Sequence, residues 1–162
     1  MKRQTTLFDY QERSKLLIIT SCSKKKLNYS AKAKDLYQGN LFKKVNILSK
    51  KIGADLMVLS TKYGLINSET IIEPYDQKIL YKSDIDRLRK ISNPILSNLE
   101  SIYTKIIIIM GQKYRKVIQP VINNTTKCIV VNSKSGIGGY LKKINMLIES
   151  NNPRKEILEV GS

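Results

Sequence analysis

The feature that most constrains the fold is a run of four aliphatic residues, LLII at 16–19, near the beginning of the chain. Two of the four are β-branched, which is typical of a strand buried on both faces, as in a parallel sheet. Small polar residues and Cys22 follow at 20–23, and three lysines occupy 24–26. Ligands of open α/β sheets bind beyond the carboxyl ends of the strands. The stretch therefore predicts a core strand that ends at a ligand, while a solvated loop after a core strand is the simpler alternative.

Three further aliphatic runs, at residues 55–60, 105–110 and 128–131, predict three more buried strands. Helical periodicity lies between the strands, and this alternation is typical of an α/β domain with a parallel sheet. We expect a single doubly wound domain over residues 14–150, with a four-stranded parallel sheet in the order 2-1-3-4. The chain then crosses over between its second and third strands, so a cleft should open between strands one and three.

End signals predict where several helices begin and end. Gly39 precedes an amphipathic segment that is expected to be a helix, and Gly53 should end that helix. Ser83, with Asp86 three residues later, predicts the start of a second helix with a capping box. Pro94 should break or kink this second helix.

Positive charge is spread along the chain and is not confined to a tail. The 162 residues include 29 Lys and Arg against 13 Asp and Glu, a formal net charge of +16. From residue 13 to residue 62 there are 12 basic and two acidic residues, and from 101 to 148 there are eight basic and no acidic residues. A field of this sign attracts polyanions, of which nucleic acid is the commonest large one. We therefore expect DNA as a partner, with RNA as a second candidate; a lysine-rich composition without such a partner is the alternative.

Two cysteines and the absence of histidine exclude several chemistries. Without histidine there is no Cys/His zinc site, no Ser-His-Asp triad and no Cys-His dyad. Cys22 follows one predicted strand and Cys128 opens another, so reduced cysteines in a cytoplasmic protein are expected in place of a disulfide framework. No apolar run reaches the roughly 18 residues that a membrane-spanning helix needs, and no signal peptide is recognisable. We expect a soluble monomer without a metal or cofactor and without a membrane partner.

The two terminal segments are expected to lie outside the domain. Residues 1–13 should be a flexible peptide, in which Gln4, Leu7 and Tyr10 are spaced by three, so that one turn of 3₁₀ helix would align them. This spacing resembles the motif by which replication and repair proteins dock on the sliding clamp, although one aromatic residue stands where the full motif has two. The resemblance implies that these three residues bind the clamp; the alternative is that they pack on the domain. Residues 151–162 are expected to form a C-terminal tail.

The predicted strand ends bring together residue types that suit nucleic acid. Lysine and arginine bind phosphate, tyrosine stacks on bases, and asparagine hydrogen-bonds base edges. The extended segment at 73–76 can fold over these strand ends. The candidate nucleic-acid-binding residues are Ser23, Lys25, Lys26, Lys62, Tyr63, Tyr75, Tyr114, Arg115 and Asn132. Glycines at 111, 136, 138 and 139 allow helix starts to approach an anion, but their spacing matches neither a dinucleotide fingerprint nor a P-loop.

Four ordered motifs resemble a family of small domains. They are SCSKKK at 21–26, AKDLYQGNLF at 33–42, LSTKYGLI at 59–66 and EPYD at 73–76. The family is described as YaaA-like, after the peroxide stress protein, and related segments occur in archaeosine synthase, a transfer-RNA modification enzyme. The resemblance implies a fold similar to that of uracil-DNA glycosylases between residues 17 and 147. The Gly-Gln-Asp-Pro and histidine-containing motifs of those enzymes are absent, which argues against ordinary uracil excision.

Two functional hypotheses follow. In the first, the protein is a glycosylase-like enzyme of DNA repair or base modification, recruited by the sliding clamp, that flips a modified or damaged base out of the stack. Asp76 would orient a water molecule as general base, or Cys22 or Lys24 would act as the nucleophile. In the second, the protein binds DNA without catalysis, as in stress protection, and a transfer-RNA base-modification factor is a further alternative. An enzyme should lose turnover and keep DNA affinity when Asp76 or Cys22 is replaced by alanine.

Overall fold

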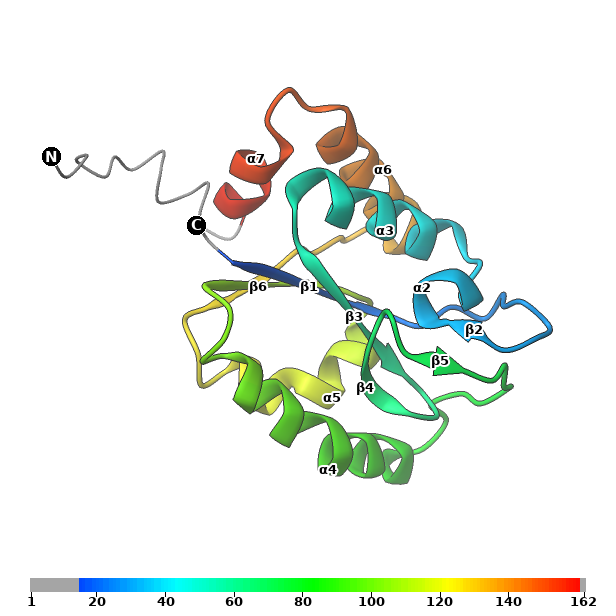
Figure 1. Ribbon diagram of the computed structural model, residues 1–162. Helices are drawn as coiled ribbons and strands as arrows, with labels where there is room; N and C mark the ends of the chain where they lie inside the picture. The colour runs from blue at the N-terminus through cyan, green and yellow to red at the C-terminus, as the bar shows by residue number, and fades with distance from the viewer. Residues whose placement is uncertain (1–14, 161–162) are drawn as a thin grey trace, which may run out of the picture.

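The computed structural model describes residues 15–160, which are built around a five-stranded sheet (Figure 1). Four strands are parallel, and the fifth pairs antiparallel with β3 at one edge. The strands are β1 (Leu16–Ser21), β3 (Asp55–Ser60), β4 (Gly64–Asn67), β6 (Lys105–Ile109) and β7 (Cys128–Val130), in the spatial order β4-β3-β1-β6-β7. The prediction of an α/β domain with a mainly parallel sheet is confirmed.

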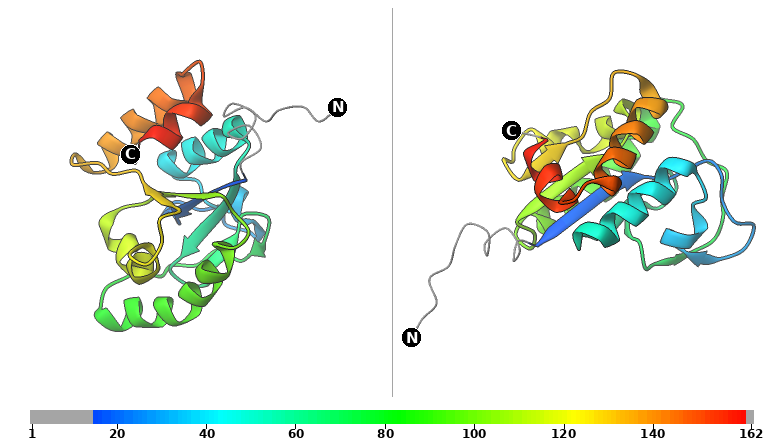
Figure 2. Two further views of the ribbon diagram at one scale, coloured as in Figure 1. Left: turned by 90° about the vertical axis from the view of Figure 1, so that its left-hand side faces the viewer. Right: turned by 90° about the horizontal axis from the view of Figure 1, so that it is seen from above.

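Helices cover both faces of this sheet, as the two turned views in Figure 2 show. One face carries α3 (Asn40–Ile52), α6 (Gly136–Glu149) and α7 (Pro153–Glu159), which pack together. The other face carries α4 (Lys82–Leu99) and α5 (Gln112–Ile122). Because α3 follows β1 and α5 follows β6, the chain leaves these neighbouring strands toward opposite faces. A doubly wound sheet opens a cleft at such a point.

The predicted four-stranded sheet in the order 2-1-3-4 is wrong for the sheet as a whole. Numbered in chain order, its five strands lie in the order 3-2-1-4-5. The additional strand is β4, which has only four residues and begins with Gly64, so its sequence is typical of a turn. Pairing across the hairpin places Leu65 beside Leu59, and burial of both side chains makes this segment a strand.

The alternation of side chains along β1 divides the core into two parts. Leu16 and Ile18 belong to the hydrophobic cluster under α3 and α6, whereas Leu17 and Ile19 belong to the cluster under α4 and α5. All four side chains are buried, and each contributes about 1.5–3 kcal/mol to folding. The run of four aliphatic residues is therefore required by a central strand that is covered on both faces.

Glycines set both ends of α3, as predicted. The helix is preceded by the short helix α2 (Ala33–Leu36), and Gly39 is its N-cap. Gly53 is its C-cap and has a φ of 67°, in the left-handed region that favours glycine.

The predicted start of α4 is wrong, and of the two outcomes predicted at Pro94, a break or a kink, the break is not observed. The N-cap is Tyr81, and the carboxylate that accepts its backbone N–H, at 2.9 Å, belongs to Asp84. The expected pair of Ser83 and Asp86 plays no part in this cap. The helix also continues through Pro94, because packing on α5 outweighs a local cost of about 3 kcal/mol.

Part of the predicted C-terminal tail is a helix. The segment that becomes α7 starts after Asn152, whose side chain accepts a hydrogen bond from the Lys155 N–H at 3.2 Å. Ile157 is fully buried in the cluster under α3 and α6. The interpretation of residues 151–162 as a tail therefore fails for α7, because one buried side chain in a short segment gives no helical period.

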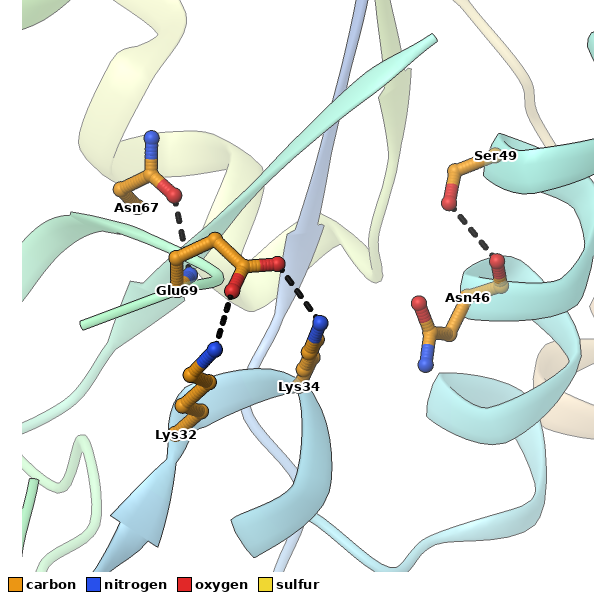
Figure 3. A network of polar contacts seen from close by, with 6 residues as sticks. All are labelled: Lys32, Lys34, Asn46, Ser49, Asn67 and Glu69. Carbon is orange, nitrogen blue, oxygen red and sulfur yellow. Dashed lines mark hydrogen bonds and ion pairs between the residues drawn. The ribbon is translucent and has the colours of Figure 1, made fainter. Parts of the chain in front are cut away.

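A small second sheet lies beside the main one. It pairs β2 (Ala31–Lys32) antiparallel with β5 (Ile71–Ile72). Glu69 binds both Lys32 and Lys34, with N–O distances of 2.9 and 2.7 Å (Figure 3). The hydrogen bond from Lys34, followed by that from Lys32, lowers the pKa of the Glu69 carboxyl to about 2. Both ammonium groups at this place are engaged within the fold, and one of their two positive charges is offset.

Candidate functional site

A pocket of about 870 Å³ lies beyond the carboxyl ends of β1, β6 and β7. Its lining comes from the end of β1 and the segment after it (residues 20–25), the segment after β7 (residues 132–133) and the N-terminal parts of α3, α5 and α6. The pocket lies at the point where the chain leaves β1 and β6 toward opposite faces of the sheet. The cleft that the sequence predicts between these two strands is therefore present, and it extends to β7.

Three helices begin at this pocket. Their N-caps are Gly39 for α3, Gly111 for α5 and Ser135 for α6, and none of these residues makes a side-chain cap. None of the three helices has an acidic residue in its first turn. The first N–H groups of each helix therefore lack an intrahelical partner, and the helix dipole leaves partial positive charge there. Such helix starts favour anions.

Three basic side chains line the pocket, and no carboxylate among the described residues does. Lys24 and Lys25 come from the segment after β1, and Arg115 comes from the first turn of α5. Arg115 Nη1 donates to Asn132 Oδ1 at 3.2 Å. Within residues 15–160 the ammonium groups of Lys24 and Lys25 have no hydrogen-bond or ion-pair partner, so their charge is available to a ligand.

The segment that carries Lys24 and Lys25 is held against the start of α3. The Ser23 hydroxyl donates to the Lys25 carbonyl at 2.8 Å and accepts from the Gly39 N–H at 3.1 Å. The Gln38 N–H donates to the same carbonyl, at 2.8 Å. A side chain at residue 39 does not fit, because its Cβ would lie 2.7 Å from the Ser23 Cβ. Close contact between glycine and serine thus positions the two lysines.

Cys22 lies in the wall of the pocket. It is 8% exposed, and its sulfur lies 3.8 Å from both the Thr61 Oγ1 and the Tyr114 hydroxyl oxygen. Burial, followed by the neighbouring Cys22, raises the pKa of Tyr114 above its usual range, so this hydroxyl is neutral at physiological pH. Cys128 does not line the pocket, and burial, followed by Glu100, raises its pKa to about 11. Of the two thiols, Cys22 is the one placed to meet a ligand.

Tyr75, a predicted base-stacking residue, belongs to a hydrogen-bonded cluster. Its hydroxyl lies 2.7 Å from both the Tyr37 hydroxyl and the Ser60 Oγ. The Lys26 ammonium lies 4.5 Å from the centre of its ring, and the Tyr63 ring meets it edge-on with 5.6 Å between centroids. Burial raises the pKa of Tyr75, which keeps the hydroxyl neutral. The cluster fastens the loop after β5 to the end of β3, which is a structural role.

The structure brings some of the candidate residues to the pocket and leaves others away from it. The candidates that line the pocket are Cys22, Ser23, Lys24, Lys25, Tyr114, Arg115 and Asn132. The candidates that do not line it are Lys26, Lys62, Tyr63, Tyr75 and Asp76. Asp76, the candidate general base, is exposed and is not among the lining residues. Gln4, Leu7 and Tyr10 lie outside the described residues.

The starts of α3 and α6 supply lining residues that the sequence did not indicate. They include Asn40 and Phe42 from α3, and Ile137 and Tyr140 from α6. The Tyr140 hydroxyl donates to the Met110 carbonyl at 3.0 Å, which fixes α6 against the end of β6. The sequence feature that could have indicated these lining residues is a glycine near the start of each helix, because glycine permits a close approach of the backbone to a ligand.

A comparison with protein families gives a match over most of the chain. A family model described as "Family of unknown function (DUF6884)" matches residues 17–145, which run from β1 into α6 and include the lining of the pocket. No curated protein and no solved structure matches the chain. In residues 15–160, no helix is long and apolar enough to cross a membrane. The same residues contain no group of three or more cysteine or carboxylate side chains that could hold a metal ion.

Proposed function

The chain belongs to the DUF6884 family, whose function is unknown, and we propose that it binds nucleic acid and holds one unstacked nucleotide in the pocket. The observation that carries this proposal is the composition of the pocket: three basic side chains, three helix starts and, in the described part of the chain, no carboxylate. The formal net charge of +16 adds a long-range attraction for polyanions.

Phosphate is the chemical group that this pocket suits best. Backbone N–H groups at helix starts donate to phosphate oxygens, and lysine and arginine neutralise phosphate charge. The basic groups come from two different walls, since Lys24 and Lys25 follow β1 whereas Arg115 belongs to α5. A phosphate in the pocket would therefore meet positive charge from more than one element.

The rest of the lining offers apolar surface to a base. Leu41, Phe42, Ile137 and Leu141 line the pocket beside its polar groups. Small-molecule sites have volumes of about 300–1,000 Å³, and the volume of about 870 Å³ falls in this range. Flipping a base out of a stack costs a few kcal/mol, and contacts with these side chains would offset that cost.

We propose base processing in DNA repair or base modification as the chemistry of this site, on the glycosylase-like fold that the sequence motifs imply. Cys22 and Lys24 are the candidate nucleophiles that line the pocket. No described carboxylate lines it, so a nucleophilic role of Cys22 or Lys24 is favoured over activation of a water molecule by Asp76. Oligonucleotides with a panel of modified bases, scored for abasic sites or strand cleavage, would test this. Turnover that Cys22→Ala and Lys24→Ala leave unchanged would rule out both nucleophiles.

Binding should depend steeply on salt. If the basic surface replaces counterions on roughly five phosphates, the log–log slope of affinity against salt should be about −4 to −5 on duplex DNA and less steep on single strands. Fluorescence anisotropy of labelled oligonucleotides measures this slope. An affinity that stays flat between low and moderate salt would contradict nucleic-acid binding through the basic surface.

Asn40→Asp tests the pocket itself, because it places a carboxylate in the first turn of α3. An acidic residue there should stabilise the helix by about 0.3–1 kcal/mol. It should nevertheless weaken nucleic-acid binding about 10-fold, because it repels phosphate. Asn98→Asp makes the same change of charge on the exposed surface of α4 and should leave the affinity within about 2-fold of the parent. Equal affinities of the two variants would overturn the pocket as the binding site.

A further inference from the structure

We propose that a nucleic-acid strand with one nucleotide in the pocket continues across residues 132–133 into a second hollow on the exposed side of α6. This inference rests on the proposed function of the pocket and adds the course of the ligand beyond it. The second hollow has a volume of about 490 Å³ and lies between the turn after β7 and α6. It is the surface on which the neighbouring nucleotides would lie.

The two hollows adjoin, because Asn132 and Ser133 line both of them. Both shared side chains are short, and Gly139 lies so close to Ser133 that a Cβ would not fit there. Arg115 of the first pocket donates to the Asn132 side chain, and Lys143 of the second hollow donates to the Asn132 carbonyl. A strand that passes from one hollow to the other therefore crosses the short side chains of Asn132 and Ser133 and meets the basic groups of Arg115 and Lys143 beside them.

The second hollow is basic and is not neutralised by the described fold. Lys134, Lys142 and Lys143 line it, and none of its lining residues is acidic. Lys143 is engaged with the Asn132 carbonyl. Within residues 15–160, the ammonium groups of Lys134 and Lys142 have no hydrogen-bond or ion-pair partner. Because a strand carries a phosphate at every nucleotide, a ligand anchored in the pocket presents further phosphates to these two lysines.

An exposed apolar side chain accompanies the basic groups in each hollow. Ile137 lines the first pocket and is 69% exposed, and Met146 lines the second hollow and is 63% exposed. Single-stranded nucleic acid offers both surfaces that such a lining needs, charged phosphates and flat base faces. A free inorganic anion would use the lysines alone. The combination therefore favours a single strand as the occupant.

Lys134→Ala with Lys142→Ala separates the strand path from the pocket. For a single-stranded oligonucleotide of about 10 nucleotides, the affinity should fall roughly 10-fold and the salt slope should become less steep by about 1 to 2. The affinity for a 5′-mononucleotide, which occupies the pocket alone, should stay unchanged. Lys50→Ala with Lys155→Ala removes two exposed lysines from α3 and α7, outside both hollows, and is the matched control.

The outcomes distinguish this inference from the proposed function. If the parent protein does not bind the oligonucleotide, or if Asn40→Asp leaves its affinity unchanged, the proposed function fails. If the parent binds and Asn40→Asp weakens binding, but the Lys134 and Lys142 double variant matches the control variant, the strand path alone fails. A double variant that loses affinity for the mononucleotide to the same degree as for the oligonucleotide would also overturn the strand path.

Discussion

Two lysine pairs, eight residues apart in the sequence, have opposite surroundings in the fold. Lys32 and Lys34 share the carboxylate of Glu69 beside β2 and β5, which offsets one of their two positive charges and occupies both ammonium groups. Lys24 and Lys25 line the pocket, where no residue of the described range supplies a carboxylate. The difference teaches that the placement of the 13 acidic residues, and not the number of basic ones, decides which positive charges remain available to a ligand.

The starts of the helices show the same division. The helices α4 and α7 begin away from the pocket, and each has an acidic residue in its first turn, Asp84 and Glu156. The helices α3, α5 and α6 begin at the pocket and have none. An acidic residue at a helix start is stabilising, because it interacts favourably with the helix dipole. Where no acidic residue is present, a bound anion can make this interaction with the helix start instead.

The largest expected effect concerns ligand binding at the two lysine pairs. Lys24→Glu with Lys25→Glu should weaken nucleic-acid binding at least about 100-fold at low salt, because like charges then meet in the pocket. Lys32→Glu with Lys34→Glu makes the same change of net charge and should weaken it by less than about 3-fold, because that charge acts only over distance. Competition binding at fixed salt measures both losses. Similar losses of affinity in the two double variants would contradict the difference between the two lysine pairs, since binding would then depend on total charge alone.

A smaller effect, on stability, should follow from Gly39→Ala, which disturbs the contact that holds the pocket lysines. The new Cβ would lie 2.7 Å from the Ser23 Cβ, and overpacking of this kind costs about 1–3 kcal/mol. Gly138→Ala is the control, because a Cβ at that residue meets nothing within 4 Å and alanine is the better helix former. Denaturant unfolding measures both changes. A Gly39→Ala protein as stable as the parent would show that the contact with Ser23 is not needed to hold the segment.

The smallest expected effect is the pH dependence of stability that comes from the ion pairs of Glu69 with Lys32 and Lys34. Hydrogen bonds from Lys34 and then Lys32 lower the pKa of Glu69 from 4.5 to about 2. A carboxyl with a lowered folded-state pKa adds stability above its unfolded pKa, and this stability is lost as pH falls through the folded pKa. The difference in Tm between the parent and Glu69→Gln should therefore be constant above pH 4.5 and disappear toward pH 2. It should be small, since the ion pairs are exposed, and a difference that persists unchanged at pH 2 would contradict this assignment.

The parallel strands of the fold are predictable from sequence, and its short elements are not. A strand covered on both faces needs an unbroken aliphatic run, as at residues 16–19, and such runs are rare enough to recognise. The strand β4 and the helix α7 are too short to show a period, and packing decides them. The prediction of the start of α4 fails for a different reason. Ser83 and Asp86 fit the spacing of a capping box as well as the observed pair, Tyr81 and Asp84, does.

The pocket is predictable where it follows from the direction of the strands. Cys22 and Arg115 come soon after β1 and β6, and the carboxyl ends of parallel strands share one edge. Tyr75 could not be placed, because the path of its loop depends on contacts with Tyr37 and Ser60 that are distant in sequence. Phe42 was missed because an apolar residue near a helix start is indistinguishable from an ordinary core residue.

The direction of β1 determines how far from the pocket a partner that is bound to the N-terminal residues would lie. The strand runs from Lys15 to the pocket, about 20 Å at the usual rise per residue. The five residues from Gln11 to Lys15 extend at most about 18 Å. We propose from their spacing that Gln4, Leu7 and Tyr10 bind a sliding clamp. The clamp would then be connected to the first residue of β1, at the end of the strand that is remote from the pocket. Leu7→Ala with Tyr10→Ala should then release the clamp without changing the affinity for nucleic acid, and a joint loss of both in binding assays would contradict this geometry.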